Sequence, residues 1–397
     1  MNYALSDRAK IAEPNLMREI DKFAEIIPGF ISLADGNPAY ESFPLDELRK
    51  LSDDTYANDQ KEIFLYGSTG GSEALCSKIA ERLERVKNIK ADGNKVLVTG
   101  GAQGVLFIMP MVFVNQGDRV IFEEFSYSNA LTAVRLFGGE PVGVKSEPDG
   151  IDTEALEEAL KNTERVKYIY IQPNFSNPTG RTLSLEKRKK VYELACKYDV
   201  LILEDDAYGD LRYEGEFLPC IKSFDTDGRV VYTSTFSKTI AAGMRVGFCT
   251  AAPEVIDRIY ACKSAIDSGT NMAAQLVVLK YMERYDFEQH IVDTRKIYDN
   301  KRQVMKKALD KYVHPACTVE VPSGGMFCWV TVPDYVNEKD MFDSLIENKI
   351  GVVPSYVFSS DRSIPGKSFR ICFSFESAEN IEEGCKRFGE VTHNYCK

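Results

Sequence analysis

The chain has 397 residues, which is enough for two domains or for one large core with a smaller companion. Hydrophobic residues make up 44% of it and charged residues 27%, which is ordinary for a soluble globular protein. The formal net charge of -11 argues against a nucleic-acid-binding surface, because phosphate backbones require clustered lysine and arginine.

The ten cysteines do not form a disulfide pattern. No C-x-x-C occurs, and most of them lie in apolar stretches, where reduced cysteine behaves as a small hydrophobe. The N-terminal stretch "MNYALSDRAKIAEPN" contains no apolar signal-peptide core, and no apolar run is long enough to cross a bilayer. We therefore expect a cytoplasmic protein without a membrane segment.

From about residue 95 to 250, short β-rich runs alternate with amphipathic helical patterns. The predicted strands are 95–99, 119–123, 139–144, 167–172, 199–205, 230–235 and 245–250. Continuous apolar runs of this kind are typical of strands that are buried on both faces of a sheet. The alternation therefore predicts an α/β fold with a mostly parallel sheet of seven strands flanked by helices.

Beyond residue 250 the pattern changes to helices followed by strands. The predicted elements are helices within 253–285, 290–312 and 338–348, and strands at 324–332 and 368–375. The loop-rich segment before residue 46 is expected to pack with these later elements. We therefore expect a large domain at residues 46–285 and a smaller α+β domain formed by residues 1–45 together with 286–397.

The loops that follow parallel strands are where ligands usually bind. After the first predicted strand, "TGGAQG" (99–104) presents backbone N–H groups at the start of a helix, which suits a phosphate. It matches neither GxGxxG nor GxxxxGK[ST], and a plain tight turn remains the competing interpretation. After the second strand comes Tyr127, which is either a ligand contact or an aromatic residue at the rim.

The stretch "QPNFSNPTG" follows the predicted strand 167–172. Pro178 restricts the backbone of Asn177, and Gly180 closes the tight turn. An asparagine that is held in this way donates a hydrogen bond in a fixed direction.

Three adjacent acids, Glu204 to Asp206, stand where the strand 199–205 ends. Their mutual repulsion would be wasteful in a purely structural turn. An aspartate at this edge can instead face a cationic ring nitrogen, with Tyr208 beside it as a hydrogen-bond donor. Metal binding is the rival interpretation. Because the three histidines are far apart in the sequence, only a magnesium site built from oxygen ligands remains open.

Lys238 lies in the run "TSTFSKTIAAGMRVG" (233–247), among hydroxyl groups and seven residues before Arg245. A lysine that forms a Schiff base must spend time uncharged, so it needs a lowered pKa. Burial near a cation such as Arg245 would lower it, and the hydroxyls with Arg245 could hold a phosphate. The competing interpretation is an ordinary surface lysine.

Taken together, these motifs resemble those of the fold-type I, pyridoxal-phosphate-dependent class I/II aminotransferases. The stretches that carry the resemblance occur in the family's order over residues 30–376: "YGSTGG", "TGGAQG", "FSY", "NPTG", "DDAY", "STFSK", "SGGMFCWV" and "FRICFSF". Within this family, the motifs are most similar to those of the branch that holds 2-aminoadipate and kynurenine aminotransferases. The resemblance implies pyridoxal 5'-phosphate as the cofactor and a homodimer as the assembly.

The resemblance also implies roles for individual residues. Lys238 would hold the cofactor as a Schiff base and move a proton, which makes it catalytic together with Asp205 and Tyr208. Asp205 would pair with the ring nitrogen, so that the ring can accept electrons. Asn177 and Tyr208 would hydrogen-bond the ring oxygen, and Tyr127 would stack on the ring.

The remaining implied contacts concern the phosphate and the substrate. The residues placed around the phosphate are Gly101, Ala102, Thr235, Ser237, Arg245 and, from the other subunit, Tyr66. Arg370 would grip the substrate α-carboxylate as a planar fork, Asn177 would lie beside it, and Gly36 would let the N-terminal segment approach the substrate.

Three departures from the family pattern matter. Thr235 stands where many relatives have serine, which keeps the hydroxyl. Gly101-Ala102 replaces the Ser-Gln of the near branch, so only backbone N–H groups are expected to meet the phosphate there. Arg245 falls one residue earlier than in the aspartate aminotransferase branch, which argues against that branch.

The leading hypothesis is an aminotransferase that moves an amino group from an L-amino acid to a 2-oxo acid, with 2-oxoglutarate expected, by a ping-pong mechanism. One alternative keeps the cofactor but makes the enzyme a carbon–sulfur β-lyase or an aminocyclopropane-type synthase. Another is the effector-sensing module of a transcription regulator. We expect neither nucleic-acid nor membrane partners and no metal. An N-terminal helix-turn-helix would have no room, since the family pattern begins near residue 30.

Overall fold

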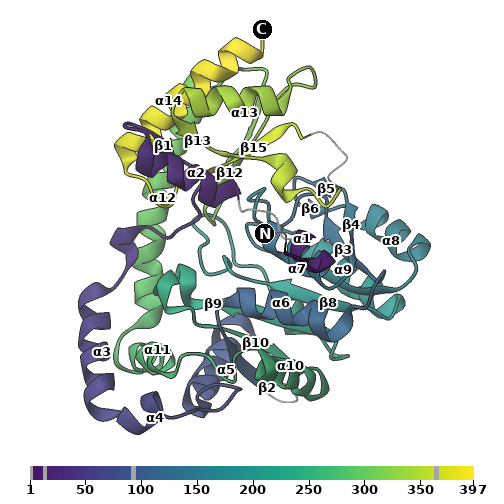
Figure 1. Ribbon diagram of the computed structural model, residues 1–397, viewed down its shortest axis with the longest axis vertical. Coiled ribbons are helices and arrows are strands. Elements are labelled where there is room, and N and C mark those ends of the chain that lie inside the picture. Colours follow the sequence, from purple (N-terminus) through teal and green to yellow (C-terminus); the bar gives the residue numbers. More distant parts are fainter. Residues whose placement is uncertain (1–2, 12–15, 91–94, 362–365) are drawn as a thin grey trace.

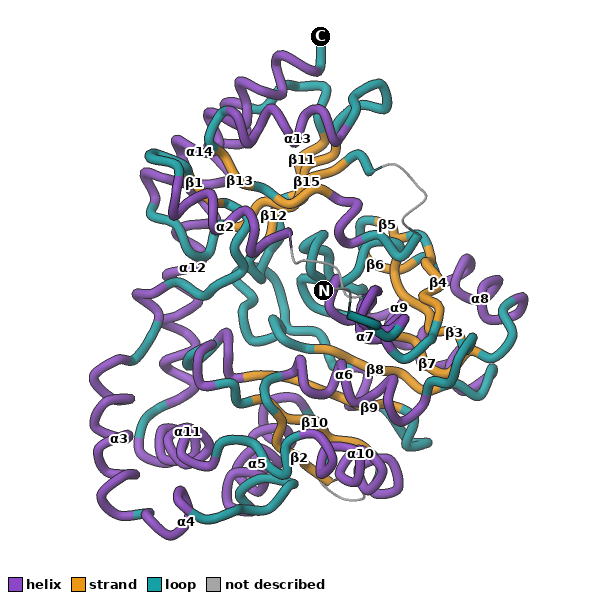
Figure 2. The backbone as a smooth tube through the Cα atoms, in the orientation of Figure 1, coloured by secondary structure: helices purple, strands orange, loops and turns teal. Residues whose placement is uncertain are grey.

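The computed structural model describes residues 3–11, 16–90, 95–361 and 366–397, and a seven-stranded sheet runs through its larger part (Figures 1 and 2). In spatial order its strands are β2 (Lys95–Thr99), β10 (Gly247–Ala251), β9 (Val230–Thr235), β8 (Leu201–Asp205), β7 (Val166–Ile171), β3 (Arg119–Glu123) and β4 (Glu140–Val144). Each corresponds to a predicted strand, with bounds that differ by at most two residues. The mostly parallel α/β sheet predicted from the sequence is confirmed.

The direction of β10 is the exception within this sheet. It runs antiparallel to both of its neighbours, β2 and β9, whereas the pairs β9–β8, β8–β7, β7–β3 and β3–β4 are parallel. The carboxyl ends of the other six strands therefore meet at one edge of the sheet, and the amino end of β10 lies at that same edge. This is the edge at which open α/β sheets bind ligands.

Helices bury both faces of the sheet. Along β7, Tyr168 and Tyr170 join the core under one group of helices, while Ile169 and Ile171 join the core under the other. This alternation explains why the strand is a continuous apolar run. The first face packs against α6 (Ala102–Phe113), α7 (Ser128–Leu136) and α10 (Pro253–Ile266). The opposite face packs against α5 (Glu73–Lys87), α8 (Thr153–Asn162), α9 (Leu185–Lys197) and α11 (Met272–Arg284).

Local capping signals define several of these helices. The side chains of Ser72, Asp152 and Ser184 accept hydrogen bonds from the first-turn N–H groups of α5, α8 and α9. At the other end of α5, Asn88 adopts a left-handed conformation with φ of 53°, which ends the helix directly after Lys87.

Helices α3 (Leu45–Asn58) and α4 (Gln60–Phe64) follow one another before α5, and β5 (Ser146–Glu147) pairs with β6 (Gly150–Ile151). Among the described helices, none has the length and apolar character that a bilayer span requires.

A second, smaller sheet is antiparallel and has the order β11-β12-β15-β14. Its strands are β11 (Thr318–Glu320), β12 (Phe327–Thr331), β15 (Ser368–Cys372) and β14 (Val353–Pro354). Beside it, β1 (Ile31–Ser32) pairs in parallel with β13 (Ile350–Gly351). The helices of this region are α2 (Leu16–Ile26), α12 (Phe287–Tyr312), α13 (Glu338–Glu347) and α14 (Ala378–Tyr395).

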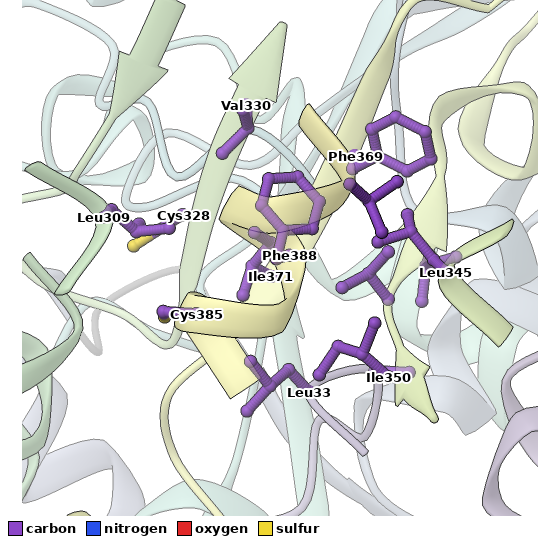
Figure 3. Close-up of a cluster of buried hydrophobic side chains, with 14 of the residues drawn as sticks. Leu33, Leu309, Cys328, Val330, Leu345, Ile350, Phe369, Ile371, Cys385 and Phe388 are labelled. Atoms are coloured by element: carbon purple, nitrogen blue, oxygen red, sulfur yellow. The ribbon is translucent and has the colours of Figure 1, made fainter. Parts of the chain in front are cut away.

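A separate hydrophobic core holds this second region together (Figure 3). Leu33 from the N-terminal segment, Leu309 of α12 and Phe388 of α14 meet in it, and each is at most 1% exposed. The N-terminal segment therefore packs against the C-terminal part of the chain, although more than 250 residues separate them. The short helix α1 (Asp7–Ile11) lies elsewhere, against α7 (Figure 1).

Candidate active site

A cavity of about 390 Å³ lies where the carboxyl ends of the large sheet face the second sheet. The predicted site residues that line it are Gly36, Ala102, Tyr127, Asn177, Asp205, Tyr208, Thr235, Ser237, Lys238, Arg245 and Arg370. These residues come from positions that span most of the chain, and the fold gathers them in one place. Within the described part of the chain, Gly101 and Tyr66 do not line this cavity.

Lys238 ends a short 3-10 turn directly after β9, which aims its side chain into the cavity. Its Nζ donates a hydrogen bond to the backbone oxygen of Gly36 at 2.8 Å and lies 6.0 Å from the ring centre of Tyr208. Burial lowers the pKa of Lys238 to about 8, and the charges of Arg370 and Arg245 act in the same direction. Near neutral pH a usable fraction of this amine is therefore uncharged and nucleophilic.

Asp205 is the last residue of β8 and is 2% exposed. Its Oδ2 accepts hydrogen bonds from the Tyr170 hydroxyl at 2.8 Å and from Gln172 Nε2 at 2.9 Å. Its Oδ1 is buried and has no hydrogen-bond partner among the described residues. Burial, reinforced by the neighbouring charge of Asp206, raises the pKa of Asp205 to about 6. A buried carboxylate oxygen without a donor is suited to receive one from a cationic N–H group in the cavity.

The other two acids of the "EDD" run have structural partners. Glu204 accepts the backbone N–H groups of Ile221 and Lys222, both at 2.8 Å, and burial raises its pKa to about 7. Asp206 accepts hydrogen bonds from Asn174 at 2.7 Å and from the Tyr232 hydroxyl at 2.8 Å. Of the three carboxylates, only Asp205 lines the cavity. The expectation that adjacent carboxylates would be unfavourable in a purely structural role is therefore wrong for Glu204 and Asp206. Each of these two accepts hydrogen bonds from its own set of donors.

Metal binding by these acids was the rival interpretation. Across residues 3–11, 16–90, 95–361 and 366–397, no group of three or more histidine, cysteine, aspartate or glutamate side chains is arranged to hold a metal ion.

Hydroxyl groups and a guanidinium form a cup at another side of the cavity. The Thr235 hydroxyl donates to Ser237 Oγ at 2.8 Å, and Arg245 Nη1 donates to the same oxygen at 3.3 Å. Helix α6 begins at Ala102, which lines the cavity, so its free N–H groups lie at this cup. A cation, two hydroxyls and a helix N-terminus together suit a phosphate dianion.

Gly101 contributes to this cup through its lack of a side chain. Its φ is +74°, a conformation that favours glycine, and a Cβ there would lie 2.6 Å from Arg245 Nη2. The glycine therefore lets the guanidinium lie against the start of α6. This is a physical reason for the Gly101-Ala102 pair that departs from the near branch of the family.

Arg370 enters the cavity from β15 and is 1% exposed. Its Nη1 donates to Asn177 Oδ1 at 2.9 Å, and its guanidinium carbon lies 4.3 Å from the ring centre of Phe327. Its Nε is buried and makes no hydrogen bond within the described chain. Burial lowers the pKa of Arg370, yet a guanidinium stays charged at any physiological pH. The side chain is thus a fixed cation facing the same cavity as Lys238.

Several cavity residues were missed by the sequence reasoning. Gln172 links two predicted residues: it donates to Asp205, and its Oε1 accepts the backbone N–H of Asn177 at 2.9 Å. Asn129 donates to the Tyr127 hydroxyl at 2.9 Å and to Gln103 at 3.1 Å. Gln172 carried a detectable signal, because it is the first polar residue after a buried strand. Other cavity residues, from the N-terminal segment and from β12, are Met17, Arg18, Asp21, Asp35, Asn37 and Phe327.

Tyr66 is the predicted site residue that lies apart. It follows α4 and is 99% exposed, so its hydroxyl projects into solvent.

The groups that face the cavity fit pyridoxal 5'-phosphate. Lys238 offers an amine with a lowered pKa to an aldehyde, and the unpartnered Oδ1 of Asp205 can receive the ring N–H. Thr235, Ser237 and Arg245 offer the donors that a phosphate requires. The amine and the phosphate donors come from residues 233–247 and the carboxylate from the end of β8, and together they match three separate features of the cofactor.

Comparison with known proteins agrees with this fit. The family model for aminotransferase class I and II matches residues 28–388. Aromatic-amino-acid aminotransferase 1 of Thermococcus litoralis is 33% identical over 390 residues, which cover 97% of this chain and 93% of that protein.

Solved structures that match the whole fold include those of two named aminotransferases. Kynurenine aminotransferase of Pyrococcus horikoshii, in complex with PMP, superposes with a TM-score of 0.95 at 33% identity, covering 99% of this chain and 98% of the other. The α-aminoadipate aminotransferase of Thermus thermophilus, complexed with N-(5'-phosphopyridoxyl)-L-leucine, gives a TM-score of 0.91 at 29% identity, covering 99% and 98%.

The predicted family, cofactor and activity are thereby confirmed, and lyase or synthase chemistry is not favoured. The chain belongs to the aminotransferase class I and II family and is a pyridoxal-phosphate-dependent enzyme that transaminates amino acids.

Proposed function

We propose that this aminotransferase works by a ping-pong mechanism in which an L-amino acid is the donor and 2-oxoglutarate is an acceptor. The observation that supports it is the convergence of Lys238, the free Oδ1 of Asp205 and the buried Arg370 on one cavity. When bound, pyridoxal phosphate supplies an aldehyde that takes up the amino group and a ring that withdraws electrons. The chain's own residues must then bind, orient and move protons.

In this proposal Lys238 is the covalent anchor and the base. Its lowered pKa would allow the amine to take a proton from the α-carbon of the donor amino acid in the first half-reaction. In the second half-reaction the same group would return a proton to the α-carbon of the product amino acid. Asp205 would keep the ring nitrogen of the bound cofactor protonated, because an ionised carboxylate favours an adjacent cation. The Tyr208 hydroxyl and Asn177 would hydrogen-bond the ring oxygen and so orient the cofactor, and Tyr127 would stack on the ring.

Substrate orientation is assigned to Arg370. The guanidinium is planar and can make two parallel hydrogen bonds to a carboxylate. Both the donor amino acid and the acceptor 2-oxo acid carry an α-carboxylate, so one arginine serves both half-reactions. Gly36 lets the N-terminal segment lie close to the ring of Phe327, because a Cβ at this position would lie only 3.3 Å from that ring.

The test is a half-reaction with a panel of amino donors. The relatives named above are aminotransferases of aromatic amino acids, kynurenine and 2-aminoadipate, so these join the common amino acids in the panel. At least one donor is expected to convert the cofactor's aldehyde absorbance to that of its amine form, and 2-oxoglutarate is expected to reverse the change. If no donor shifts the absorbance, or if a donor releases pyruvate without any 2-oxo acid, the proposal is wrong.

We also propose that the enzyme is a homodimer whose cavity is completed by Tyr66 of the partner subunit. Phe64 and Leu65 are each 69% exposed and adjoin Tyr66, which is 99% exposed. Consecutive large apolar side chains on a surface are typical of an interface. A tyrosine that lies outside its own cavity can serve the site only in another protomer.

The proposed dimer is tested by the mass of the assembly and by the cofactor affinity of the variant Tyr66→Phe. Light scattering is expected to give twice the protomer mass of 44.6 kDa for wild type and variant alike. The dissociation constant of pyridoxal phosphate should rise by about 10- to 100-fold, because one hydrogen bond to a charged group is lost. Tyr56→Phe, at a tyrosine that is 54% exposed on α3, is the control and should change neither quantity. A monomeric wild type would refute the proposal.

We assign residues 46–285 to a large domain and residues 1–45 with 286–397 to a small one. We place the enzyme in the cytoplasm, a compartment in which thiols stay reduced. All ten cysteines lie within the described ranges and none forms a disulfide, which supports that location.

A further inference from the structure

A row of alternating buried charges begins directly behind the cofactor acid. Asp206 Oδ2 lies 3.2 Å from Lys87 Nζ, which lies 2.9 Å from Asp210 Oδ1. Asp210 Oδ2 is in turn 3.0 Å from Arg82 Nη2. The four side chains are between 1% and 16% exposed, so water screens these charges weakly. None of the four lines the active-site cavity.

The fold places Lys87 at this point for local reasons. It is the last residue of α5, and Asn88 turns the chain away in a left-handed conformation. The carboxyl end of a helix carries a partial negative charge, which favours a cation there. The Asp210 and Asp206 carboxylates outweigh the cost of burial and raise the pKa of Lys87, so the ammonium is permanently charged.

We propose that Lys87 is a positioning residue for transamination: its ammonium balances Asp206, so that the adjacent Asp205 stays ionised opposite the cofactor's ring nitrogen. The inference rests on the role proposed for Asp205. It extends that role to a lysine that touches neither cofactor nor substrate. Without Lys87, two neighbouring buried carboxylates would have to be charged at once, which is costly.

The electrostatic direction follows from the surroundings. The charge of Asp206 contributes to the raised pKa of Asp205. Burial alone would raise the pKa of Asp206 as well, yet the Lys87 ammonium holds it below its ordinary value. Removing Lys87 leaves the repulsion between the two aspartates uncompensated, and the pKa of Asp205 should rise further.

Other charged or titratable groups also face this pair of acids. Those around Asp205 are Tyr127, Tyr170 and Tyr208, and those around Asp206 are Glu204, Asp210, Tyr232, Cys220, Arg188 and Arg212. The Arg188 guanidinium is engaged elsewhere, since it donates to Asn174 Oδ1 and to the backbone oxygens of Leu183, Pro173 and Pro219. Among the residues that the structure describes, Lys87 is the cation in direct contact with Asp206.

The test is the dissociation constant of pyridoxal 5'-phosphate measured by equilibrium dialysis between pH 5 and 8. As Asp205 takes up a proton, the ring nitrogen loses its partner and binding weakens. Asp205→Asn defines the part of this pH dependence that Asp205 causes, because ionisation of the phosphate itself is common to all variants. Lys87→Met should move the midpoint of that part upward by about 1 pH unit, and Asp206→Asn should move it downward. The double variant Lys87→Met/Asp206→Asn should return it close to wild type.

A matched control separates this effect from a loss of stability. Lys280 of α11 is 9% exposed and contacts two carboxylates, Asp54 at 2.7 Å and Asp59, and none of the three lines the active-site cavity. Lys280→Met should lower the thermal midpoint as Lys87→Met does, while leaving the pH midpoint unchanged. Lys87→Arg, which restores a cation, should return the midpoint towards wild type.

Each outcome decides one point. If Asp205→Asn leaves the pH dependence unchanged, the role proposed for Asp205 is wrong. If Asp205→Asn removes the pH dependence but Lys87→Met matches wild type, Lys87 is only structural and the inference alone fails. If Lys87→Met does not fold, Asp206→Asn decides the matter, and a midpoint that does not fall overturns the inference.

Discussion

Replacing Lys238 by alanine is expected to abolish covalent attachment of pyridoxal phosphate and to lower turnover by about 10⁴-fold or more, because the proposed mechanism uses this one residue as both anchor and base. The amine that burial adjusts to a pKa of about 8 has no substitute in an alanine methyl group. The measurement is intact protein mass after borohydride reduction, together with steady-state turnover. Wild type should gain the mass of one cofactor per chain, and the variant none.

The fold of the Lys238→Ala variant should persist, since the lost hydrogen bond to Gly36 is a single contact at the edge of the cavity. Circular dichroism should match wild type. Lys296→Ala, at a lysine that is 68% exposed on α12, should keep both the label and the turnover. A Lys238→Ala protein that still carries a reduced cofactor adduct would place the anchor on another lysine.

The second large effect is expected for Arg370→Lys, which keeps the charge but loses the planar fork. Two hydrogen bonds to a carboxylate are each worth about 1.5–3 kcal/mol, so kcat/KM should fall by about 10²- to 10⁴-fold. The loss should appear for donor and acceptor alike, since both carry an α-carboxylate. Cofactor affinity should change by only a few fold, because the phosphate cup is untouched.

Arg212→Lys provides the comparison for this prediction. Arg212 is also buried, at 8% exposed, and its guanidinium lies 4.7 Å from the ring centre of Phe175. Its replacement should cost stability, measured as a lower thermal midpoint, and leave kcat/KM within a few fold. If Arg370→Lys loses less than tenfold in kcat/KM, the α-carboxylate is held elsewhere.

The large sheet could be predicted from the sequence because its strands are buried on both faces. Such strands are continuous apolar runs, as in β7, where Tyr168 and Ile169 serve opposite faces. The reversed direction of β10 was not predictable in this way, because an antiparallel strand that is paired on both sides has the same apolar composition as its parallel neighbours. Direction depends on the connection, here the short segment between β9 and β10.

The site was predictable where residues follow strands, and less so elsewhere. Asp205 and Asn177 stand at strand ends, and the motif order then supplied their roles by resemblance. The divergent partners of Glu204 and Asp206 were not predictable, because they lie on segments that only the folded chain brings near. The same holds for Met17 and Arg18, which reach the cavity from α2 across more than 200 residues of sequence.

The reversed direction of β10 determines how Lys238 and Arg245 are placed relative to each other. Lys238 and Arg245 lie in the connection between two neighbouring strands, β9 and β10, which are hydrogen-bonded along their length. The spacing between the proposed covalent tether and the guanidinium is therefore set within a single hairpin, so shifts of the outlying strands should leave it unchanged. If Lys238 and Arg245 hold the coenzyme as proposed, loops elsewhere in the molecule can diversify to suit new substrates while both points of attachment stay the same.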